Sequence, residues 1–283
     1  MTTTAGFVGL GNIGKPMALR LASSGLDLIV FDVAADPVAE LVSAGAKAAS
    51  SVAELAGQVD VLCVMVRDDD QVREVLGEAL GTARAGLTVA IHSTVAPGTP
   101  TDLADSAARH DVRVVDAPVS GGAMGAAQGT MAIMAGGTED AFTACRPVFE
   151  VMAGMVVHAG PIGAGTRMKL ARNLMHFVAF TAATEAQRLA EAAGLDLVEL
   201  GKIVRHTDAI TGGPGAIMYR ATTAPMAPDD GWYGIFEHVR VLGEKDLRFA
   251  VALAEELGVD VPLARQAFDR LAPGLGLANK EQA

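Results

Sequence analysis

The sequence GFVGLGNIGKPMALRL at residues 6–21 indicates the fold of the N-terminal part of this chain. It begins as an apolar strand-like run, turns through three glycines spaced GxGxxG, and continues with apolar residues at helical spacing. Glycine is needed because the backbone has to turn tightly and approach a pyrophosphate closely, and the helix start stabilises its negative charge. We therefore expect a dinucleotide-binding turn with cofactor contacts from Gly9, Gly11, Asn12, Ile13 and Gly14.

The next strand-like run, LDLIVFD at 26–32, bears on the choice of cofactor. A glycine triplet alone is a weak signal, because it also occurs by chance and in folds that bind FAD or S-adenosylmethionine. The run ends at Asp32, however, and a carboxylate there can accept hydrogen bonds from both ribose hydroxyls and repel a 2′-phosphate. No arginine follows Asp32 to receive a phosphate, so NAD is favoured over NADP. The alternative, Asp32 as a helix cap, stays open.

Short apolar runs and helical segments alternate from residue 5 to about residue 159. Several runs lack the polar alternation of a half-exposed sheet, which is typical of strands covered on both faces in a parallel sheet. The segments at 13–25, 36–45, 69–80 and 100–110 have helical spacing. The pattern predicts a doubly wound α/β domain. The expected strands cover 5–10, 26–32, 60–66, 87–93, 112–119, 129–137 and 155–160.

After residue 160 long helical periods dominate. The stretch 206–234 carries Gly, Pro and the only Trp, so we expect a long loop over a site. The chain is thus expected to form an N-terminal Rossmann-type domain at 1–162, which binds the dinucleotide, and an all-helical domain at 163–283 for substrate binding and oligomerisation. The expected helices of this second domain cover roughly 163–193, 196–206, 234–257 and 262–272.

The composition excludes several classes of protein. The 283 residues are 51% hydrophobic and 19% charged, as in an ordinary globular protein. A net charge of −11 argues against nucleic acid or an anionic membrane as partner. Cys63 and Cys145 lie in apolar runs and are expected to be buried thiols in a reducing compartment. The start MTTTAGFVGLG has no signal-peptide pattern and no apolar run reaches membrane-spanning length, so we expect a cytoplasmic protein.

A possible carboxylate site follows a predicted strand in VVDAPVSGGAMGAAQGTMAIMAGG at 114–137. Open α/β sheets bind ligands beyond the carboxyl ends of their strands. Ser120 supplies a hydroxyl there, and Gly121 and Gly122 supply unobstructed backbone N–H groups, which together can hold a carboxylate. An ordinary β-turn explains these residues equally well.

Lys169 and Asn173 lie four residues apart in GPIGAGTRMKLARNLMHFVAF at 160–180, and so on one face of a mostly apolar helix. Partial burial lowers the pKa of a lysine, which allows it to exchange a proton near neutral pH, whereas arginine cannot. Asn173 can donate a hydrogen bond to a hydroxyl or carboxylate without adding charge. The alternative is a surface lysine whose stem packs while its amine reaches solvent.

Four blocks of the sequence, taken together, resemble the β-hydroxyacid dehydrogenase family over nearly the whole chain. The family includes 3-hydroxyisobutyrate dehydrogenase and tartronate semialdehyde reductase and is related to 6-phosphogluconate dehydrogenase. The first block alone is not specific, but the set in this order is. The blocks are GFVGLGNIGKPMA at 6–18, DAPVSGGAMGAAQGTMAIMAGG at 116–137, GAGTRMKLARN at 163–173 and EKDLRFAVALAEELGVDVPL at 244–263.

The resemblance implies a role for each of these blocks. Lys169 would be the catalytic acid/base, and Asn173 with Ser120, Gly121 and Gly122 would hold the substrate. The strand ends at Val66 and Thr94 would border the nicotinamide. Lys245 would reach the cofactor or the substrate. From the residues alone, an exposed charge pair between Lys245 and Asp246 on a helix is equally plausible. Family members are usually dimers or tetramers built on the helical domain, so a homodimer or homotetramer is expected.

The chain also departs from its relatives. Arg172 replaces the histidine of 6-phosphogluconate dehydrogenases, and the loop before the KDL sequence at 245–247 is unusual, which leaves the exact substrate undecided. Further candidates for the pocket come from this loop and the following helix, although packing explains each of them as well. They are Trp232, Tyr233, His238 and Arg240.

The sequence thus predicts NAD-dependent oxidation of a small 3-hydroxy acid, without a metal ion. An imine reductase is a weaker alternative, since those related enzymes usually have Asp or Tyr at the position of Lys169. A non-catalytic NAD-binding sensor is the alternative from another class, and it would not need Lys169 and Asn173. An FAD protein is less favoured, because the helical half offers no sheet domain to cover the flavin.

Overall fold

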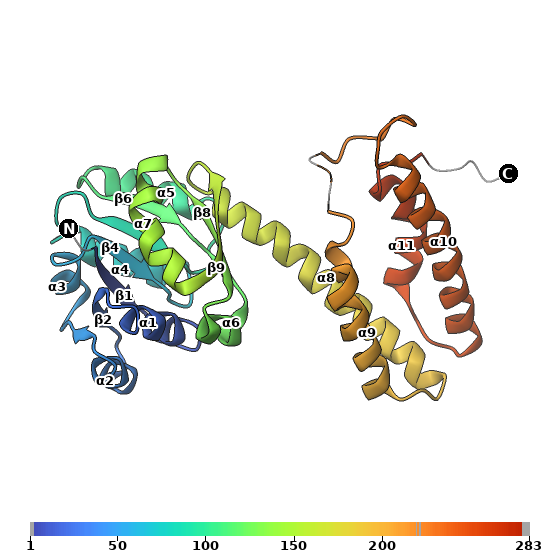
Figure 1. Cartoon of the computed structure of the whole chain (residues 1–283), viewed down its shortest axis with the longest axis horizontal. Helices are drawn as coiled ribbons and strands as arrows, with labels where there is room; N and C mark the ends of the chain where they lie inside the picture. The colour runs from blue at the N-terminus through green and yellow to red at the C-terminus, as the bar shows by residue number, and fades with distance from the viewer. Residues whose placement is uncertain (1–2, 219, 221, 279–283) are drawn as a thin grey trace. The chain divides into compact units, whose positions relative to one another are not determined.

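The computed structural model describes residues 3–218, 220 and 222–278. The chain divides into two compact units, residues 1–172 and 173–283 (Figure 1). The division falls inside the helix α8 (Ala164–Ala192), which therefore contributes to both units. The domain boundary expected from the sequence, between 162 and 163, stays a prediction, and the end of the second expected domain, 279–283, lies outside the described residues.

A nine-stranded sheet forms the centre of the first unit. Eight strands follow the order β3-β2-β1-β4-β5-β6-β8-β7, and the ninth, β9, pairs with β8 in parallel. Its strands from β3 to β6 are parallel, whereas β8 runs antiparallel to β6 and β7. This is the predicted Rossmann-type sheet. The strands are β1 (Thr4–Val8), β2 (Asp27–Phe31), β3 (Lys47–Ala48), β4 (Val61–Val64), β5 (Thr88–Ile91), β6 (Arg113–Asp116), β7 (Val119–Ser120), β8 (Met131–Gly136) and β9 (Ala153–Gly160).

Helices cover both faces of this sheet. One hydrophobic cluster joins α1, α6 and α7 to one face, and a second joins α3, α4 and α5 to the other. Figure 1 shows α1 and α7 lying over the same side of the strands. This burial explains why β4, with the sequence VLCV, is apolar throughout and why β5, with the sequence TVAI, is apolar after Thr88, since neither face is exposed. The helices are α1 (Gly14–Ala22), α2 (Ala35–Ser43), α3 (Val52–Ala56), α4 (Asp69–Leu80), α5 (Thr99–Ala108), α6 (Gly122–Gln128) and α7 (Glu139–Met152).

One strand prediction needs correction. The expected strand 112–119 is two strands, β6 and β7, because the chain leaves the parallel part of the sheet at Ala117 and Pro118 and β7 pairs antiparallel with β8. Proline has no N–H to donate to a strand partner, which favours a break there. The short β3, and the helices α3, α6 and α7, were not predicted. Cys63 and Cys145 are buried free thiols, as expected.

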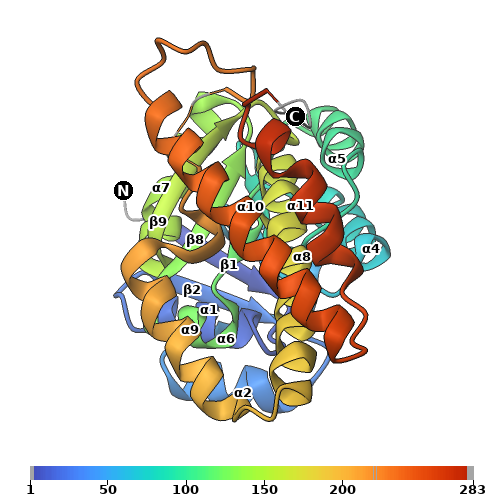
Figure 2. The same ribbon diagram turned by 90° about the vertical axis from the view of Figure 1, so that its right-hand side faces the viewer.

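The second unit is helical, as predicted. Its elements are the rest of α8, α9 (Leu197–Thr211), the 3-10 turn η1 (Gly213–Gly215), α10 (Tyr233–Glu256) and α11 (Pro262–Gly274). The helix expected at 196–206 is longer, because it continues to Thr211 before Gly212 ends it in a left-handed conformation. Figure 2 shows α10 and α11 running side by side, and they form the most extensive helix pair of this unit. Within the described residues, no helix is both long and apolar enough to cross a bilayer.

Candidate active site

The glycine turn lies between β1 and α1, at the carboxyl end of the parallel strands. Gly9 has φ +93°, and a methyl group at this position would meet the Met65 carbonyl oxygen. A methyl group at Gly14 would meet the Gly9 carbonyl oxygen, so both positions require glycine. Gly11 is exposed and faces open space. The exposed Asn12 and the half-buried Ile13 complete the turn, and Ile13 precedes the first residue of α1.

A cavity of about 440 Å³ opens beside this turn. The ends of β1, β2 and β4 and one side of α4 line it, with Gly9, Gly11, Asp32 and Val66 among its residues. An unobstructed Gly11 next to a concave, mostly apolar surface and a carboxylate suits a dinucleotide, whose pyrophosphate needs a close backbone approach. The residues present therefore fit the cofactor that the glycine motif implies.

Asp32 connects two loops of this cavity. Its carboxylate oxygens accept hydrogen bonds from the backbone N–H of Leu10, at 2.5 Å, and of Ala34, at 2.8 Å. The residue that caps α2 is Ala34, without a side-chain cap, so the alternative of Asp32 as the helix cap is wrong. Asp32 instead ties the end of β2 to the glycine turn and lines the cavity.

Helix α4 and its preceding loop bring charged residues to the same cavity that the sequence pattern does not reveal. Arg67 lines it together with Glu74 and Glu78. No arginine follows Asp32 in the sequence to receive a phosphate, but Arg67 follows β4 and reaches the cavity through the sheet topology. Arg67 is exposed, and its Nε lies 3.0 Å from the Asp68 carboxylate, so a neighbouring acid partly neutralises it.

The loops after β4 and β5 lie against each other. The Ser93 hydroxyl accepts a hydrogen bond from the Val66 N–H at 2.9 Å and donates one to the Val66 carbonyl at 2.7 Å. Ser93 is buried, whereas the next residue, Thr94, is exposed and Val66 is half-buried. The structure therefore brings the two predicted nicotinamide neighbours, Val66 and Thr94, onto adjoining loops.

Lys169 lies in the first unit, inside the protein. Its side chain is 9% exposed, and Nζ donates a hydrogen bond to the Val119 carbonyl at 2.5 Å. Burial, and secondly the charge of Arg172, lower the pKa of Lys169. The amine thus does not reach out as a surface lysine would, and the alternative of a solvated lysine is wrong. Its partner Val119 precedes Ser120, so the structure brings together Lys169 and the predicted substrate-binding segment.

A buried carboxylate fixes the start of the helix that carries Lys169. Asp116, at the end of β6, accepts hydrogen bonds from the backbone N–H of Gly163, at 2.7 Å, and of Thr166, at 2.6 Å. These N–H groups lie at the start of α8, where a helix has no partners of its own for them. A methyl group at Gly165 would lie 2.6 Å from the Asp116 carbonyl oxygen, which shows how closely α8 approaches the sheet. Sequence analysis did not assign Asp116 a role.

Ser120, Gly121 and Gly122 join the end of β7 directly to α6. Gly121 has φ +139° and Gly122 has φ +64°, conformations that favour glycine. Both glycines are exposed, or nearly so, at the surface of the unit, and Ser120 is half-buried. The segment is therefore a junction between a strand and a helix, not the separate β-turn of the alternative interpretation.

The remaining predicted residues belong to the second unit. Asn173 is half-buried on α8, and Lys245 forms an exposed pair with Asp246 at 3.2 Å on α10. Of the other candidates, Tyr233 packs against the apolar cluster of Phe236, and His238 is exposed. These roles stay predictions.

Two further candidates have structural partners on or next to α10. Trp232 packs near Phe236, with ring centroids 6.1 Å apart. The buried Arg240 binds the carboxylates of Glu237, at 2.5 Å, and Glu244, at 2.7 Å, and these neighbours raise its pKa.

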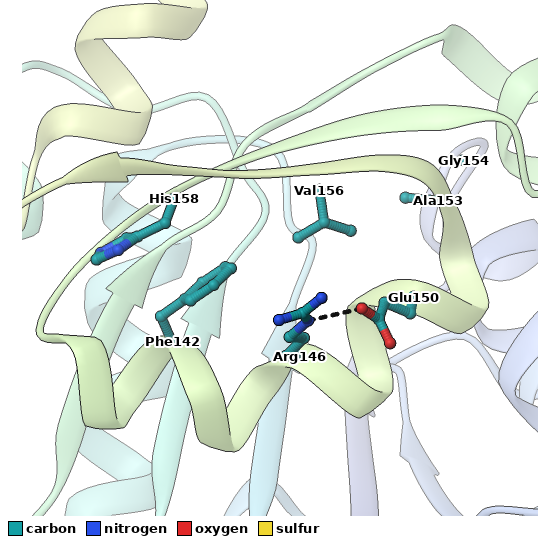
Figure 3. Close-up of a pocket in the computed structure, with 7 residues that line it drawn as sticks. All are labelled: Phe142, Arg146, Glu150, Ala153, Gly154, Val156 and His158. Carbon is teal, nitrogen blue, oxygen red and sulfur yellow. Dashed lines mark hydrogen bonds and ion pairs between the residues drawn. The ribbon is translucent and has the colours of Figure 1, made fainter.

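A second cavity of about 350 Å³ lies between α7 and β9 (Figure 3). Its ionisable groups already have partners in the first unit, and the His158 Nδ1 lies 3.1 Å from the Glu139 carboxylate. Arg146 pairs with Glu150 at 2.7 Å, and His158 contacts the Gly137 carbonyl at 2.9 Å. None of the predicted site residues lines it. Within the described part of the chain, no group of three His, Cys, Asp or Glu residues is arranged to hold a metal ion.

Family models match both halves of the chain. The model of the NAD binding domain of 6-phosphogluconate dehydrogenase matches residues 4–160. The model described as the NAD-binding region of NADP-dependent 3-hydroxyisobutyrate dehydrogenase matches residues 163–279.

Similar proteins agree with these matches. An uncharacterized oxidoreductase of Mycobacterium tuberculosis is 51% identical over 283 residues, which cover 99% of this chain and 96% of the relative. The 3-hydroxyisobutyrate dehydrogenase of Pseudomonas aeruginosa is 35% identical over 268 residues, 92% of this chain and 88% of the relative. A crystal structure of an oxidoreductase from Mycobacterium avium has 48% identity and a TM-score of 0.96, covering 98% of this chain and 100% of that one.

The chain therefore belongs to the β-hydroxyacid dehydrogenase family. It is an NAD(P)-dependent oxidoreductase that acts on CH–OH donors. An imine reductase from Streptomyces aurantiacus, at 21% identity and a TM-score of 0.75 over 96% of this chain and 95% of that one, shares the fold alone.

Proposed function

We propose that this protein oxidises a small 3-hydroxy acid, similar to 3-hydroxyisobutyrate, to the corresponding aldehyde or keto acid with NAD, and that Lys169 is the acid/base. The observation that carries the proposal is the placement of Lys169. It is a buried lysine with a lowered pKa, hydrogen-bonded to Val119 immediately before the Ser120–Gly122 segment. A lysine held inside a protein beside a carboxylate-binding segment is suited to proton transfer.

In oxidation, neutral Lys169 accepts the proton of the substrate hydroxyl at Nζ. In reduction, its ammonium form returns the proton to the same oxygen, and its charge stabilises the negative charge that develops there. Bound nicotinamide supplies the hydride acceptor or donor. The carbonyl of Val119 holds Nζ in place, which reduces the rotamers available to the long side chain.

The substrate carboxylate binds to Ser120, Gly121 and Gly122 in this proposal, with Asn173 as a neutral donor. Both glycines are exposed and have no side chain, which allows an anion to approach their backbone closely. Lys169 and Asn173 lie four residues apart on α8, which suits two groups that act on one small molecule. Val66 and Thr94 border the nicotinamide, and Lys245 contributes from α10.

The charges around the cofactor cavity favour NAD over NADP. Three carboxylates line this cavity, those of Asp32, Glu74 and Glu78, and negative charge there disfavours a 2′-phosphate. Among the described residues, the one arginine that lines the cavity, Arg67, pairs with Asp68. We expect the ribose hydroxyls of NAD to bind at Asp32, within reach of its remaining lone pairs.

The test measures reduced nicotinamide by its absorbance, with NAD and NADP against a panel of C3–C5 3-hydroxy acids and with the reduced cofactors against the matching semialdehydes. Lys169→Met is expected to lower kcat about 10²–10⁴-fold, the range of general acid–base catalysis, while NAD binding persists. Lys169→Arg keeps the positive charge, but arginine cannot exchange the proton near neutral pH, so this variant is expected to lose kcat as well. Lys47→Met, at an exposed lysine on β3 that lies 4.0 Å from the Asp27 carboxylate, is the control.

Wild-type turnover in Lys169→Met would contradict the proposed acid/base. Turnover of cyclic imines without turnover of any hydroxy acid would instead indicate an imine reductase. Tight NAD binding with no turnover of either class would indicate a sensor.

The assembly proposed is a homodimer or homotetramer built on the helical unit. Helix α9 supports it, because none of its residues is buried although several are apolar. The domain limits 1–162 and 163–283 and the cytoplasmic location stay predictions.

A further inference from the structure

We propose that Ser93 is a positioning residue, which ties the loops after β4 and β5 into one rigid support for the nicotinamide ring. The proposal rests on the roles proposed for Val66 and Thr94, which border the ring. In this proposal Ser93 acts through Val66, because its buried hydroxyl both donates a hydrogen bond to Val66 and accepts one from it.

Two hydrogen bonds join the Ser93 hydroxyl to the backbone of Val66. The Ser93 Oγ accepts from the Val66 N–H, at 2.9 Å, and donates to the Val66 carbonyl, at 2.7 Å. One hydroxyl thereby satisfies both backbone groups of a residue that lies just beyond the paired part of β4. With Ser93 2% exposed, water has little access to replace these bonds.

A second tie holds the same two loops a few residues further on. The Asp69 carboxylate, at the start of α4, accepts hydrogen bonds from the Ala96 N–H at 3.1 Å and from the Thr99 hydroxyl at 2.5 Å. Thr99 is the first residue of α5, so this tie joins the beginnings of the two helices. The loops 65–69 and 92–99 are thus connected at both ends.

The β5 loop is also tied on its other side. The His92 imidazole, buried between Phe7 and Phe149, contacts the Ala117 carbonyl through Nδ1 at 2.8 Å. Burial lowers the pKa of His92 to about 4, so it is a neutral donor near neutral pH. Thr94 lies between these anchored residues and is exposed, so a ligand can contact it.

A purely structural role for Ser93 makes a different prediction. In that case Ser93 would support the domain as a whole, and its loss would weaken the binding of NAD and of ADP-ribose equally. If Ser93 positions the support of the nicotinamide ring, its loss weakens only the binding contributed by the nicotinamide end of NAD. ADP-ribose distinguishes the two, because it has the adenosine and pyrophosphate of NAD but no nicotinamide.

The experiment measures the Kd of NAD and of ADP-ribose by calorimetric titration of the full-length wild type and Ser93→Ala. We expect Ser93→Ala to weaken NAD binding about tenfold, the loss of one to two hydrogen bonds, and ADP-ribose binding less than about twofold. Ser24→Ala is the matched control, since it removes a part-buried hydroxyl that bonds to the Leu21 carbonyl at 2.7 Å after α1. If the wild type prefers NADP, both proteins are titrated instead with NADP and with 2′-phospho-ADP-ribose, which lacks the nicotinamide.

An equal loss for both ligands, or no loss for either, would overturn the proposal. Because binding needs no hydroxy acid, the result is independent of whether the proposed substrate is correct. Should Ser93→Ala not fold, Asp69→Asn tests the same support, with Asp70→Asn as control in the same first turn of α4. Ser93→Thr keeps the hydroxyl and is expected to restore the preference for NAD over ADP-ribose.

Discussion

Lys169 shows how one side chain acquires its chemistry from its surroundings. Burial is the larger cause of its lowered pKa, and the positive charge of Arg172 is the second. Both destabilise the ammonium form relative to a lysine in water. Oxidation of an alcohol needs the neutral form, so this environment extends activity toward lower pH.

The second cause can be removed separately. Arg172→Gln deletes a positive charge, so the pKa of Lys169 is expected to rise while burial is unchanged. The neutral form then appears only at higher pH, and the pH profile of kcat/KM for oxidation is expected to shift to higher pH. In reduction, the ammonium form persists to higher pH, and that profile is expected to shift in the same direction. Arg167→Gln, at an exposed arginine on the same helix, serves as the control. A profile that does not move, or moves to lower pH, would show that Arg172 does not act on Lys169.

The sequence identifies some of these residues and not others, for a physical reason. Gly9 and Gly14 are visible because backbone geometry demands glycine at fixed spacing, and Lys169 because it interrupts an apolar helix. Ser93 and Asp116 are not visible, since their partners lie 27 and 47–50 residues away in the sequence. Only the order of the strands in the sheet brings those partners together.

Among the elements, the start of α8 lies directly against the backbone of β6 and β8, with no side chain between the helix and the strands. Gly165 allows this contact, because a methyl group there would collide with the backbone of Met134 and Asp116. Gly77, inside α4 of the same unit, has nothing within 4 Å of an added methyl group. Identical substitutions at the two positions should therefore have opposite effects.

Gly165→Ala is expected to destabilise the protein by about 1–3 kcal/mol, the usual cost of overpacking. Gly77→Ala is expected to stabilise it by about 0.5–1 kcal/mol, because alanine loses less conformational entropy in a helix. Urea unfolding followed by circular dichroism measures both. Stabilisation by Gly165→Ala would mean that α8 does not approach the sheet as closely as described.

The elements that the sequence did not predict have distinct causes. Helix α7 has a clear start signal, since the Thr138 hydroxyl caps it by accepting the Ala141 N–H, but Pro147 in its middle interrupts the pattern. Strand β3 has only two residues, too few to show any period. Strand β7 follows a proline and runs against the direction of the neighbouring β8, which local sequence does not encode.

At the scale of the whole molecule, the two units differ in how well they bury their apolar residues. The first unit has two extensive clusters around its sheet. In the second, α9 has no buried residue, and Val198, Ile203 and Ile210 are 65%, 62% and 71% exposed. Helices α8 and α10 also carry exposed apolar side chains, among them Leu174, Phe177 and Phe249. Exposed apolar surface of this kind usually marks a protein interface.

A charge introduced on α9 is therefore expected to disrupt the assembly. Ile203→Lys should lower the mass measured by sedimentation velocity from that of a dimer or tetramer toward that of the monomer. Met155→Lys, on β9 of the first unit and similarly exposed, is the control and should leave the mass unchanged. An assembly that survives Ile203→Lys would show that subunits meet elsewhere.

The position of the division within α8 has a practical consequence for engineering. A chimaera joined between Arg172 and Asn173 would keep Lys169, its carbonyl partner on Val119 and the glycine turn on one inherited piece. The helical half could then be exchanged with that of a relative as a module. New substrate ranges could be sought by recombining halves at this joint, with the proton-transfer machinery left as it is.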